Sequence, residues 1–145
     1  MQKVVIRPAR KKDYKEVIDL FSKFVSDEKR YKKKKSNSFH AFIKSKNSFI
    51  DVATINKKIV GFITYSIRTV VRYPRPILEV EEFFVLEEYR RLKIGKQLMT
   101  GAINSAKKNK CYGIFLGSSK DRTPAHKFYK YMKFNEYGLH YRKKP

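Results

Sequence analysis

The chain has little cysteine and no long apolar run, and each of these shortages excludes a class of protein. Its single cysteine, Cys111, excludes an intrachain disulfide and a cysteine-rich zinc site. No apolar run approaches the roughly 18–20 residues that a membrane-spanning helix needs. The first residues contain no apolar segment typical of a secretion signal. We therefore expect a cytoplasmic protein with no membrane partner.

Positive charge dominates the composition, with 35 Lys and Arg against 13 Asp and Glu and a net charge of +22. Such a charge attracts polyanions, so nucleic acid is one partner to consider. Most of these cations are Lys, however, whereas phosphate and base recognition relies on the planar fork of Arg. A solvated lysine-rich surface is the favoured reading, and nucleic acid is not the favoured partner.

The acidic residues are gathered rather than spread evenly. Five of the 13 lie within residues 79–88, where no Lys or Arg interrupts them. These are Glu79, Glu81, Glu82, Glu87 and Glu88. A local acidic pocket on a basic protein suits a cationic substrate.

Apolar periodicity predicts one α/β domain over residues 1–145, with a mixed sheet of about six strands in the order β-α-α-β-β-β-α-β-α-β. We expect a capping box at Asp13 and Glu16, a hairpin turn at residues 56–57 and an exposed basic loop at 29–35. Strands are expected at 3–7, 49–55, 58–68, 77–85, 111–116 and 137–141, and helices at 13–26, 38–45, 95–109 and from 123 onward.

A basic turn follows the acidic strand and leads into the helix at 95–109. The amino end of a helix presents unpaired N–H groups and a partial positive charge, which together hold phosphate oxygens. Arg90, Arg91, Lys93 and Lys96 add full charges beside it. The alternative is a merely solvated basic turn, which is common in a lysine-rich chain.

Two segments resemble motifs of the GNAT superfamily, the acetyl-coenzyme A-dependent N-acyltransferases. Residues 85–95 match its strand–turn–helix motif at Val85, Tyr89, Arg90, Ile94 and Gly95, with Lys93 where the family usually has glycine. Residues 122–134 match a second motif at Ala125, Phe128, Tyr129 and Phe134, with Lys133 in place of a helix-ending glycine. The strand at 78–85 is similar to that of the spermidine/spermine acetyltransferase branch.

The resemblance implies an acetyl-CoA cosubstrate, no metal and a coenzyme site in the second half of the chain. The implied coenzyme-binding residues are Phe83, Val85, Arg90, Arg91, Leu92, Lys93, Ile94, Gly95, Lys96 and Arg122. The main chain of Phe83 and Val85 would pair with the pantetheine arm, and the Val85 N–H would donate to the thioester oxygen. His40, His126 and His140 show no metal-ligand spacing.

Acetyl transfer to an amine needs a base, because an ammonium group has no lone pair to attack with. The resemblance places the family's catalytic glutamate at Glu81, with Glu82 as the second candidate and Glu79 as the third. Strand alternation predicts Glu79, Glu81, Phe83 and Val85 on one face and Glu82 on the other. Tyr129 is the candidate acid for the leaving sulfur, and its alternative is a structural place in an apolar helix stripe.

The sequence therefore favours an N-acetyltransferase acting on a primary amine of a small-molecule or protein acceptor. The alternative from another class is a non-catalytic basic module that binds nucleic acid or ribosomes on the same fold. The sequence leaves the acceptor's identity open. It also leaves open the oligomeric state, although homodimers are frequent among similar proteins.

Overall fold

The computed structural model describes residues 2–24 and 35–145, and these form two compact units that divide between Phe115 and Leu116. The first unit contains a sheet with strand order β1-β2-β3-β4-β5. Its strands are β1 (Val4–Pro8), β2 (Ser48–Ile55), β3 (Lys58–Arg68), β4 (Ile77–Val85) and β5 (Ile114–Leu116), and the last residue of β5 is the first of the second unit. Its longer helices are α1 (Tyr14–Phe24), α3 (Lys35–Lys44) and α4 (Ile94–Lys108).

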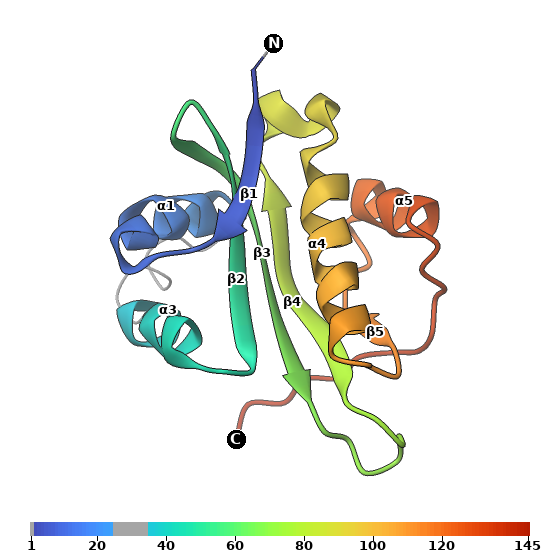
Figure 1. Cartoon of the computed structure of the whole chain (residues 1–145). Coiled ribbons are helices and arrows are strands. Elements are labelled where there is room, and N and C mark those ends of the chain that lie inside the picture. Colours follow the sequence, from blue (N-terminus) through green and yellow to red (C-terminus); the bar gives the residue numbers. More distant parts are fainter. Residues whose placement is uncertain (1, 25–34) are drawn as a thin grey trace. The chain divides into compact units, whose positions relative to one another are not determined.

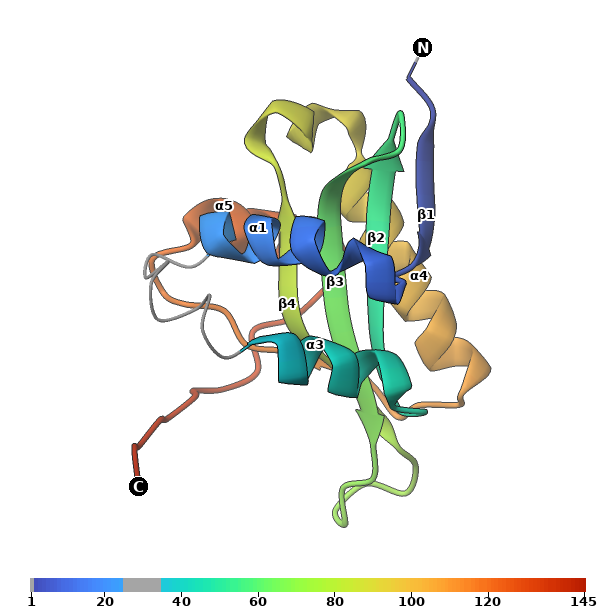
Figure 2. The same ribbon diagram turned by 90° about the vertical axis from the view of Figure 1, so that its left-hand side faces the viewer.

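Helices cover both faces of the sheet in this unit. Figure 1 and Figure 2 show α1 and α3 on one face and α4 on the other. The central strand β3 is accordingly buried at seven consecutive positions, from Ile59 to Tyr65, as expected for a strand that is covered on both sides. The α/β fold predicted from periodicity is confirmed.

Helices α1 and α4 each bury an apolar stripe. In α1 the buried residues are Val17, Ile18, Leu20 and Phe21, and in α4 they are Ile94, Leu98, Met99, Ala102 and Ala106. Phe21 stacks on Phe62 of β3 with a ring-centroid distance of 4.2 Å. This contact fixes α1 against the middle of the sheet.

The β2–β3 hairpin closes at the predicted turn. Asn56 and Lys57 both have positive φ angles, 50° and 68°, and Ile55 pairs with Lys58 across them. Two central residues with positive φ define the tight hairpin turn whose twist matches that of the flanking strands. The hairpin prediction is confirmed.

The predicted capping box at the start of α1 is wrong. Asp13 lies in a short 3₁₀ turn (η1, Lys11–Asp13), and its carboxylate accepts from the backbone N–H of Arg10 at 2.7 Å. The carboxylate of Glu16 instead accepts from the backbone N–H of Ile59 at 3.1 Å. Glu16 therefore ties α1 to β3 because tertiary packing brings that N–H within its reach.

The second unit contains helix α5 (Thr123–Tyr131). Lys133 has φ 69° after the helix, the N–H of Lys133 donates to Lys130, and the N–H of Phe134 donates to Tyr129. This pair of bonds is a Schellman motif, in which a residue in the left-handed region ends the helix. The ring of Tyr129 lies 6.0 Å from that of Phe134, which is the apolar contact that accompanies the motif.

The predicted sixth strand at 137–141 does not form. These residues have no regular secondary structure, and Tyr137, Leu139 and Tyr141 are 71%, 68% and 89% exposed. Alternating apolar residues form a strand only when one face finds a packing partner, and these side chains remain in solvent. The sheet accordingly has five strands.

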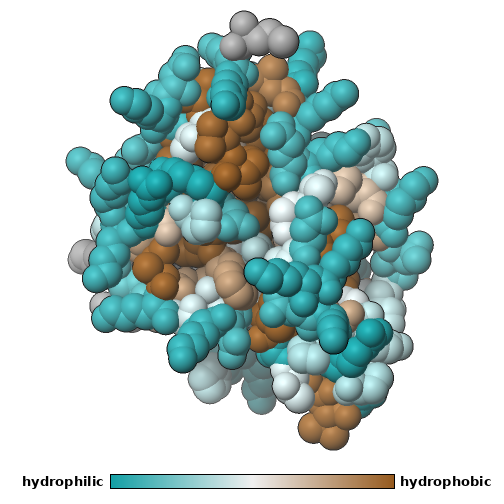
Figure 3. Space-filling view, in the orientation of Figure 1, coloured by the Kyte–Doolittle hydropathy of each residue, from teal (hydrophilic) through white to brown (hydrophobic). Residues whose placement is uncertain are grey.

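Within the described residues, no helix is long and apolar enough to cross a bilayer. The same residues contain no group of three His, Cys, Asp or Glu side chains placed to hold a metal ion. Hydrophilic side chains cover most of the face visible in Figure 3, as a lysine-rich composition predicts, and the hydrophobic areas form separate patches. The predicted basic loop at 29–35 lies mostly outside the described residues.

Candidate functional site

The strand β4 contains a β-bulge within its acidic segment. Thr64 of β3 pairs with Glu82, and the next residue, Tyr65, pairs with Val80, so Glu81 is the extra residue on β4. A bulge interrupts the alternation of side chains and redirects those around it. Cross-strand partners share a face, and Phe62, Thr64 and Ser66 pair with Phe84, Glu82 and Glu79.

The alternation predicted for the acidic strand is therefore wrong beyond the bulge. Glu82 joins Glu79 and Glu81 on the face covered by α1 and α3, whereas Phe83 and Val85 lie on the α4 face. A one-residue insertion inverts the side-chain pattern of everything that follows it. Two carboxylates that alternation would separate are thus brought to the same side of the sheet.

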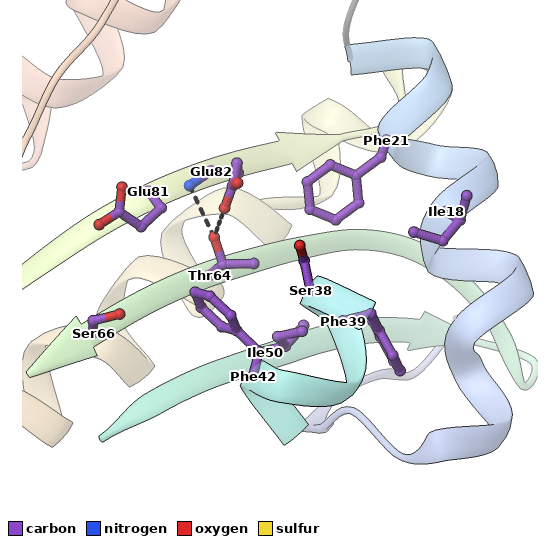
Figure 4. A pocket seen from close by; sticks show the side chains of 10 residues that line it. All are labelled: Ile18, Phe21, Ser38, Phe39, Phe42, Ile50, Thr64, Ser66, Glu81 and Glu82. Atoms are coloured by element: carbon purple, nitrogen blue, oxygen red, sulfur yellow. Dashed lines mark hydrogen bonds between the residues drawn. The ribbon is translucent and has the colours of Figure 1, made fainter. Parts of the chain in front are cut away.

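Glu81 and Glu82 line one end of a pocket of about 410 Å³ in the first unit (Figure 4). This volume lies within the range of small-molecule sites, about 300–1,000 Å³. The other described residues around the pocket come from α1, α3, β2 and β3. They are Ile18, Phe21, Ser38, Phe39, Phe42, Ile50, Thr64 and Ser66.

The carboxylate of Glu82 is fixed by a reciprocal interaction with Thr64. The hydroxyl of Thr64 donates to Glu82, and the backbone N–H of Glu82 donates back to the hydroxyl oxygen at 3.0 Å. Thr64 is 2% exposed, so its position is set by the sheet. No sequence motif marks Thr64, because its pairing with Glu82 depends on the register of β3 against the bulge.

Glu81 is more exposed than its neighbour, and its surroundings suit proton acceptance. Burial raises the pKa of the Glu81 carboxyl, the nearby charge of Glu79 raises it further, and the charge of Arg68 opposes both effects. Glu79 itself is bound by Arg68, with Nη2 at 2.5 Å from Oε2. Of the three candidate bases, Glu82 is held by Thr64 and Glu79 by Arg68, which favours Glu81.

After the bulge, the backbone N–H and C=O groups of successive β4 residues point alternately toward β3 and away from it. The N–H of Leu86 donates to the carbonyl of Val60 at 2.9 Å, so Leu86 and Val60 form a hydrogen-bonded pair. Such pairs alternate with non-hydrogen-bonded pairs in an antiparallel ladder. The main-chain groups of Phe83 and Val85 therefore point away from β3, which is the orientation that the pantetheine prediction requires.

The basic turn is a 3₁₀ helix (η2, Glu87–Leu92) that leads into α4. Arg90, Arg91, Leu92, Lys93 and Lys96 are exposed, and Ile94 is fully buried. The Arg90 side chain turns back toward β4, where its Nε donates to the carbonyl of Val85 at 3.0 Å. The turn is thereby tied to the strand, and no acidic side chain lies in the first turn of α4.

Lys93 occupies the left-handed region as the N-cap of α4, with φ 56° and ψ 24°. A residue with a side chain costs about 1–2 kcal/mol in this conformation, whereas glycine adopts it readily. Lys110 and Lys133 have the same sign of φ, 52° and 69°. Together with Lys57 of the hairpin turn, lysine therefore stands at four described positions where glycine would be favoured.

We expect Lys93→Gly to raise the free energy of unfolding by about 0.5–1 kcal/mol, because the relief of strain exceeds the extra entropy of glycine in the unfolded chain. Urea denaturation measures the change. Lys107→Gly is the matched control, since Lys107 lies within α4 and glycine there should destabilise by about 0.5–1 kcal/mol. Equal effects at both positions would contradict the assignment of strain to Lys93.

Tyr129 and Arg122 belong to the second unit, whereas the residues that line the pocket belong to the first. Burial raises the pKa of the Tyr129 hydroxyl, and the charge of Arg122 opposes the shift. The phenol therefore keeps its proton at neutral pH. Arg122 is the N-cap of α5, and its backbone N–H donates to the carbonyl of Ser119 at 3.1 Å.

Comparison with known proteins gives a family match over most of the chain. Residues 14–134 match the model of the acetyltransferase (GNAT) family. No curated protein sequence matches significantly.

Several solved structures share the fold. A transcriptional regulator from Bacillus halodurans C-125 is 27% identical, with a TM-score of 0.87, 97% of this chain covered and 100% of the other. An aminoglycoside antibiotic 6'-N-acetyltransferase from Acinetobacter baumannii is 21% identical, with a TM-score of 0.85 and 99% of each chain covered. An aminoglycoside N-acetyltransferase in complex with CoA is 19% identical, with a TM-score of 0.84, 100% of this chain covered and 97% of the other. None of these three is a polyamine acetyltransferase, so the branch suggested by the strand motif is not supported.

Proposed function

Because the chain belongs to the acetyltransferase (GNAT) family, we propose that it transfers the acetyl group of acetyl-CoA to a primary amine. The observation that supports this most directly is the acidic end of the pocket. There the β4 bulge places Glu81 and Glu82 together, on the strand that leads into the basic turn and α4. The acceptor is a small molecule or a protein amine, and residues 1–145 are proposed to act as one catalytic domain.

In the proposed reaction, Glu81 accepts a proton from the acceptor ammonium, directly or through water. The neutral nitrogen then attacks the thioester carbonyl carbon, and the C–N bond forms as the carbonyl electron pair moves to oxygen. The Val85 N–H stabilises that oxygen by hydrogen bonding, as the resemblance implies. When the carbonyl re-forms, the C–S bond breaks and the sulfur leaves with its electron pair.

We assign protonation of the departing thiolate to Tyr129, from its place in the second family motif. Its raised pKa keeps the phenol protonated, so the hydroxyl can share its proton with the sulfur as negative charge develops there. The nitrogen gives up its second proton, which passes through water to the Tyr129 phenolate, and Glu81 releases its proton to solvent. The products are the N-acetylated amine, CoA and one proton. The ring of Tyr129 also packs against Phe134 in the Schellman motif, so removing the whole side chain would change both the stability of α5 and the proposed catalysis.

We propose that the amino end of α4 and the turn at residues 90–96 hold the diphosphate of the coenzyme. Backbone N–H groups of a helix start and the surrounding cations suit a diphosphate. Lys93 has the backbone conformation that the usual glycine would have, so the turn keeps its path without that glycine. Phe83 and Val85 would pair with the pantetheine arm through the main-chain groups that face away from β3.

Thermal melting with acetyl-CoA tests the proposal. At 100 times its dissociation constant, the coenzyme should add about 2.7 kcal/mol to the free energy of unfolding, a rise in Tm of about 5–10 °C for a chain of this size. Lys96→Glu should weaken coenzyme binding about tenfold, because it places a negative charge beside the diphosphate. Lys107→Glu, at the opposite end of the same helix, is the matched control.

Two results would contradict the proposal. One is the absence of any melting shift with acetyl-CoA, and the other is equal weakening by both charge reversals. Nucleic-acid affinity that falls steeply with salt, found together with no coenzyme shift, would support the basic binding module instead.

A further inference from the structure

The pocket beside Glu81 has two chemically different ends. In Figure 4 the acidic residues of β4 and the hydroxyls of Thr64 and Ser66 lie toward one end, whereas Ile18 and Phe21 of α1 lie at the other. Phe39 and Phe42 of α3 and Ile50 of β2 extend the apolar wall. A ligand that fills this space therefore meets carboxylates with one end and hydrocarbon with the other.

The apolar wall is built from well-fixed side chains. Ile18, Phe21, Phe39 and Ile50 are between 4% and 8% exposed, so the surrounding fold holds them in place. Phe42 is half-buried and is the wall residue most open to change. Desolvation of an apolar ligand body against such a wall supplies binding free energy in proportion to the area removed from water.

The charge at the acidic end matches a single cationic centre. The pocket lining contains two carboxylates, Glu81 and Glu82, and no Lys or Arg among its described residues. Glu82 already accepts a hydrogen bond from Thr64, and the neighbouring Glu79 is bound by Arg68. A polyamine or an aminoglycoside carries several ammonium groups, and the described part of the lining offers no further carboxylate to meet them.

The field of the whole chain acts in the same direction. A net charge of +22 repels a cation in proportion to the cation's own charge. The repulsion energy of a polycation is therefore several times that of a monocation. Long-range electrostatics therefore disfavours polycationic acceptors relative to singly charged amines.

We infer that the acceptor is a small primary amine with one cationic centre and an apolar aryl or alkyl body. The ammonium group binds beside Glu81 and Glu82, and the body lies against Phe21, Phe39 and Phe42. This inference rests on the proposed function. It departs from the polyamine acceptor that the strand motif suggests.

The test is an acceptor panel with the full chain and acetyl-CoA, read by thiol release and by mass detection of the acetylated amine. The probes are 2-phenylethylamine, ethanolamine and spermidine, which are an aryl monocation, a polar monocation and a polycation. We expect kcat/KM for 2-phenylethylamine to exceed that of either other amine at least about tenfold, because only its body fills the apolar wall. Equal or higher values for ethanolamine or spermidine would overturn the inference.

Two matched variants test the wall itself. Phe42→Ala should lower kcat/KM for 2-phenylethylamine about tenfold and leave the value for ethanolamine within about threefold. Phe49→Ala removes an equally half-buried aromatic that stacks on Tyr65, outside the pocket lining, and should change neither value more than about threefold. An unchanged preference in Phe42→Ala would also overturn the inference.

Direct binding measurements separate this inference from the proposed function. Titration calorimetry of the three amines ranks their affinities without turnover, and 2-phenylethylamine should bind most tightly. If acetyl-CoA binds and spermidine is the preferred acceptor, the acetyltransferase proposal stands and the acceptor class is wrong. If acetyl-CoA does not bind and no amine is acetylated, the proposed function fails. In that case calorimetry still tests the pocket, because tighter binding of spermidine or ethanolamine than of 2-phenylethylamine would contradict the inferred preference for an apolar monocation.

Discussion

Replacing Glu81 with Gln should lower kcat by about 10²–10⁴-fold, the usual contribution of a general base. The amide keeps the shape of the carboxyl but cannot accept the acceptor's proton. Steady-state turnover with a saturating amine measures the effect. Because Glu81 is exposed and carries no described structural contact, the melting temperature should change little.

Two neighbouring glutamates provide the controls for this variant. Glu79→Gln should change kcat less than about threefold, because its partner Arg68 is itself half-exposed and the pair contributes little free energy. Glu82→Gln keeps an oxygen that can accept from Thr64, so it tests the carboxylate charge alone. A larger loss of kcat in Glu82→Gln than in Glu81→Gln would move the base role to Glu82.

The pH dependence of kcat/KM carries a further signature of Glu81. Burial and the charge of Glu79 raise its pKa, so the carboxyl loses its proton at a higher pH than an ordinary glutamate. The acid limb of the profile should accordingly lie above the usual glutamate range, and activity should rise with pH as Glu81 becomes a carboxylate. This limb should be absent from the residual activity of Glu81→Gln.

Replacing Asp13 with Ala should lower the free energy of unfolding by about 2–4 kcal/mol, because it leaves the Arg7 guanidinium partly buried without its partner. The two Asp13 oxygens accept from Arg7 at 2.7 and 3.0 Å, and the backbone N–H of Arg10 donates to the same carboxylate at 2.7 Å. The Asp13 side chain is 5% exposed and that of Arg7 is 20% exposed. Urea denaturation at neutral pH measures the loss.

Asp19→Ala is the matched control, because Asp19 is an exposed carboxylate in α1, and its replacement should change stability by less than about 0.5 kcal/mol. The hydrogen bonds from Arg7 lower the pKa of Asp13, although burial opposes the shift. A carboxylate with a lowered folded-state pKa stabilises the fold above its unfolded pKa of about 3.9, and this contribution is lost as the pH falls through the folded-state value. The difference between wild type and Asp13→Ala should therefore shrink in acid, and a constant difference from pH 7 to pH 2 would count against the ion pair.

Local pattern was sufficient for most of the elements. The β4 strand was predicted at residues 77–85, as observed, because its apolar and β-branched residues end at a clear boundary. The helix predicted at 95–109 is observed as Ile94–Lys108, since the spacing of its apolar residues is unambiguous. The strand predicted at 111–116 is shorter, at Ile114–Leu116, because the Schellman ending of α4 uses the N–H of Cys111 to bond Ala106.

The candidate site was only partly predictable. Glu81 and Glu82 were singled out from the charge pattern and the family motif, but their shared face was not, because a bulge depends on which residues of β3 and β4 pair. The apolar wall from α1 and α3 gave no motif at all. Its residues look like ordinary core side chains in the sequence, and only packing shows that they border a pocket.

By itself, the sequence determined the α/β class, the family and the residues that supply charge to the site, because apolar spacing and short motifs are local properties of the chain. Only the tertiary structure decided the register of β3 against β4, the left-handed conformation of Lys93 and the partner of Glu16. These features depend on contacts between residues distant in the chain, or on backbone strain that the surrounding fold compensates. The tertiary structure also determines the direction in which each carboxylate points, and thus the chemistry available to it.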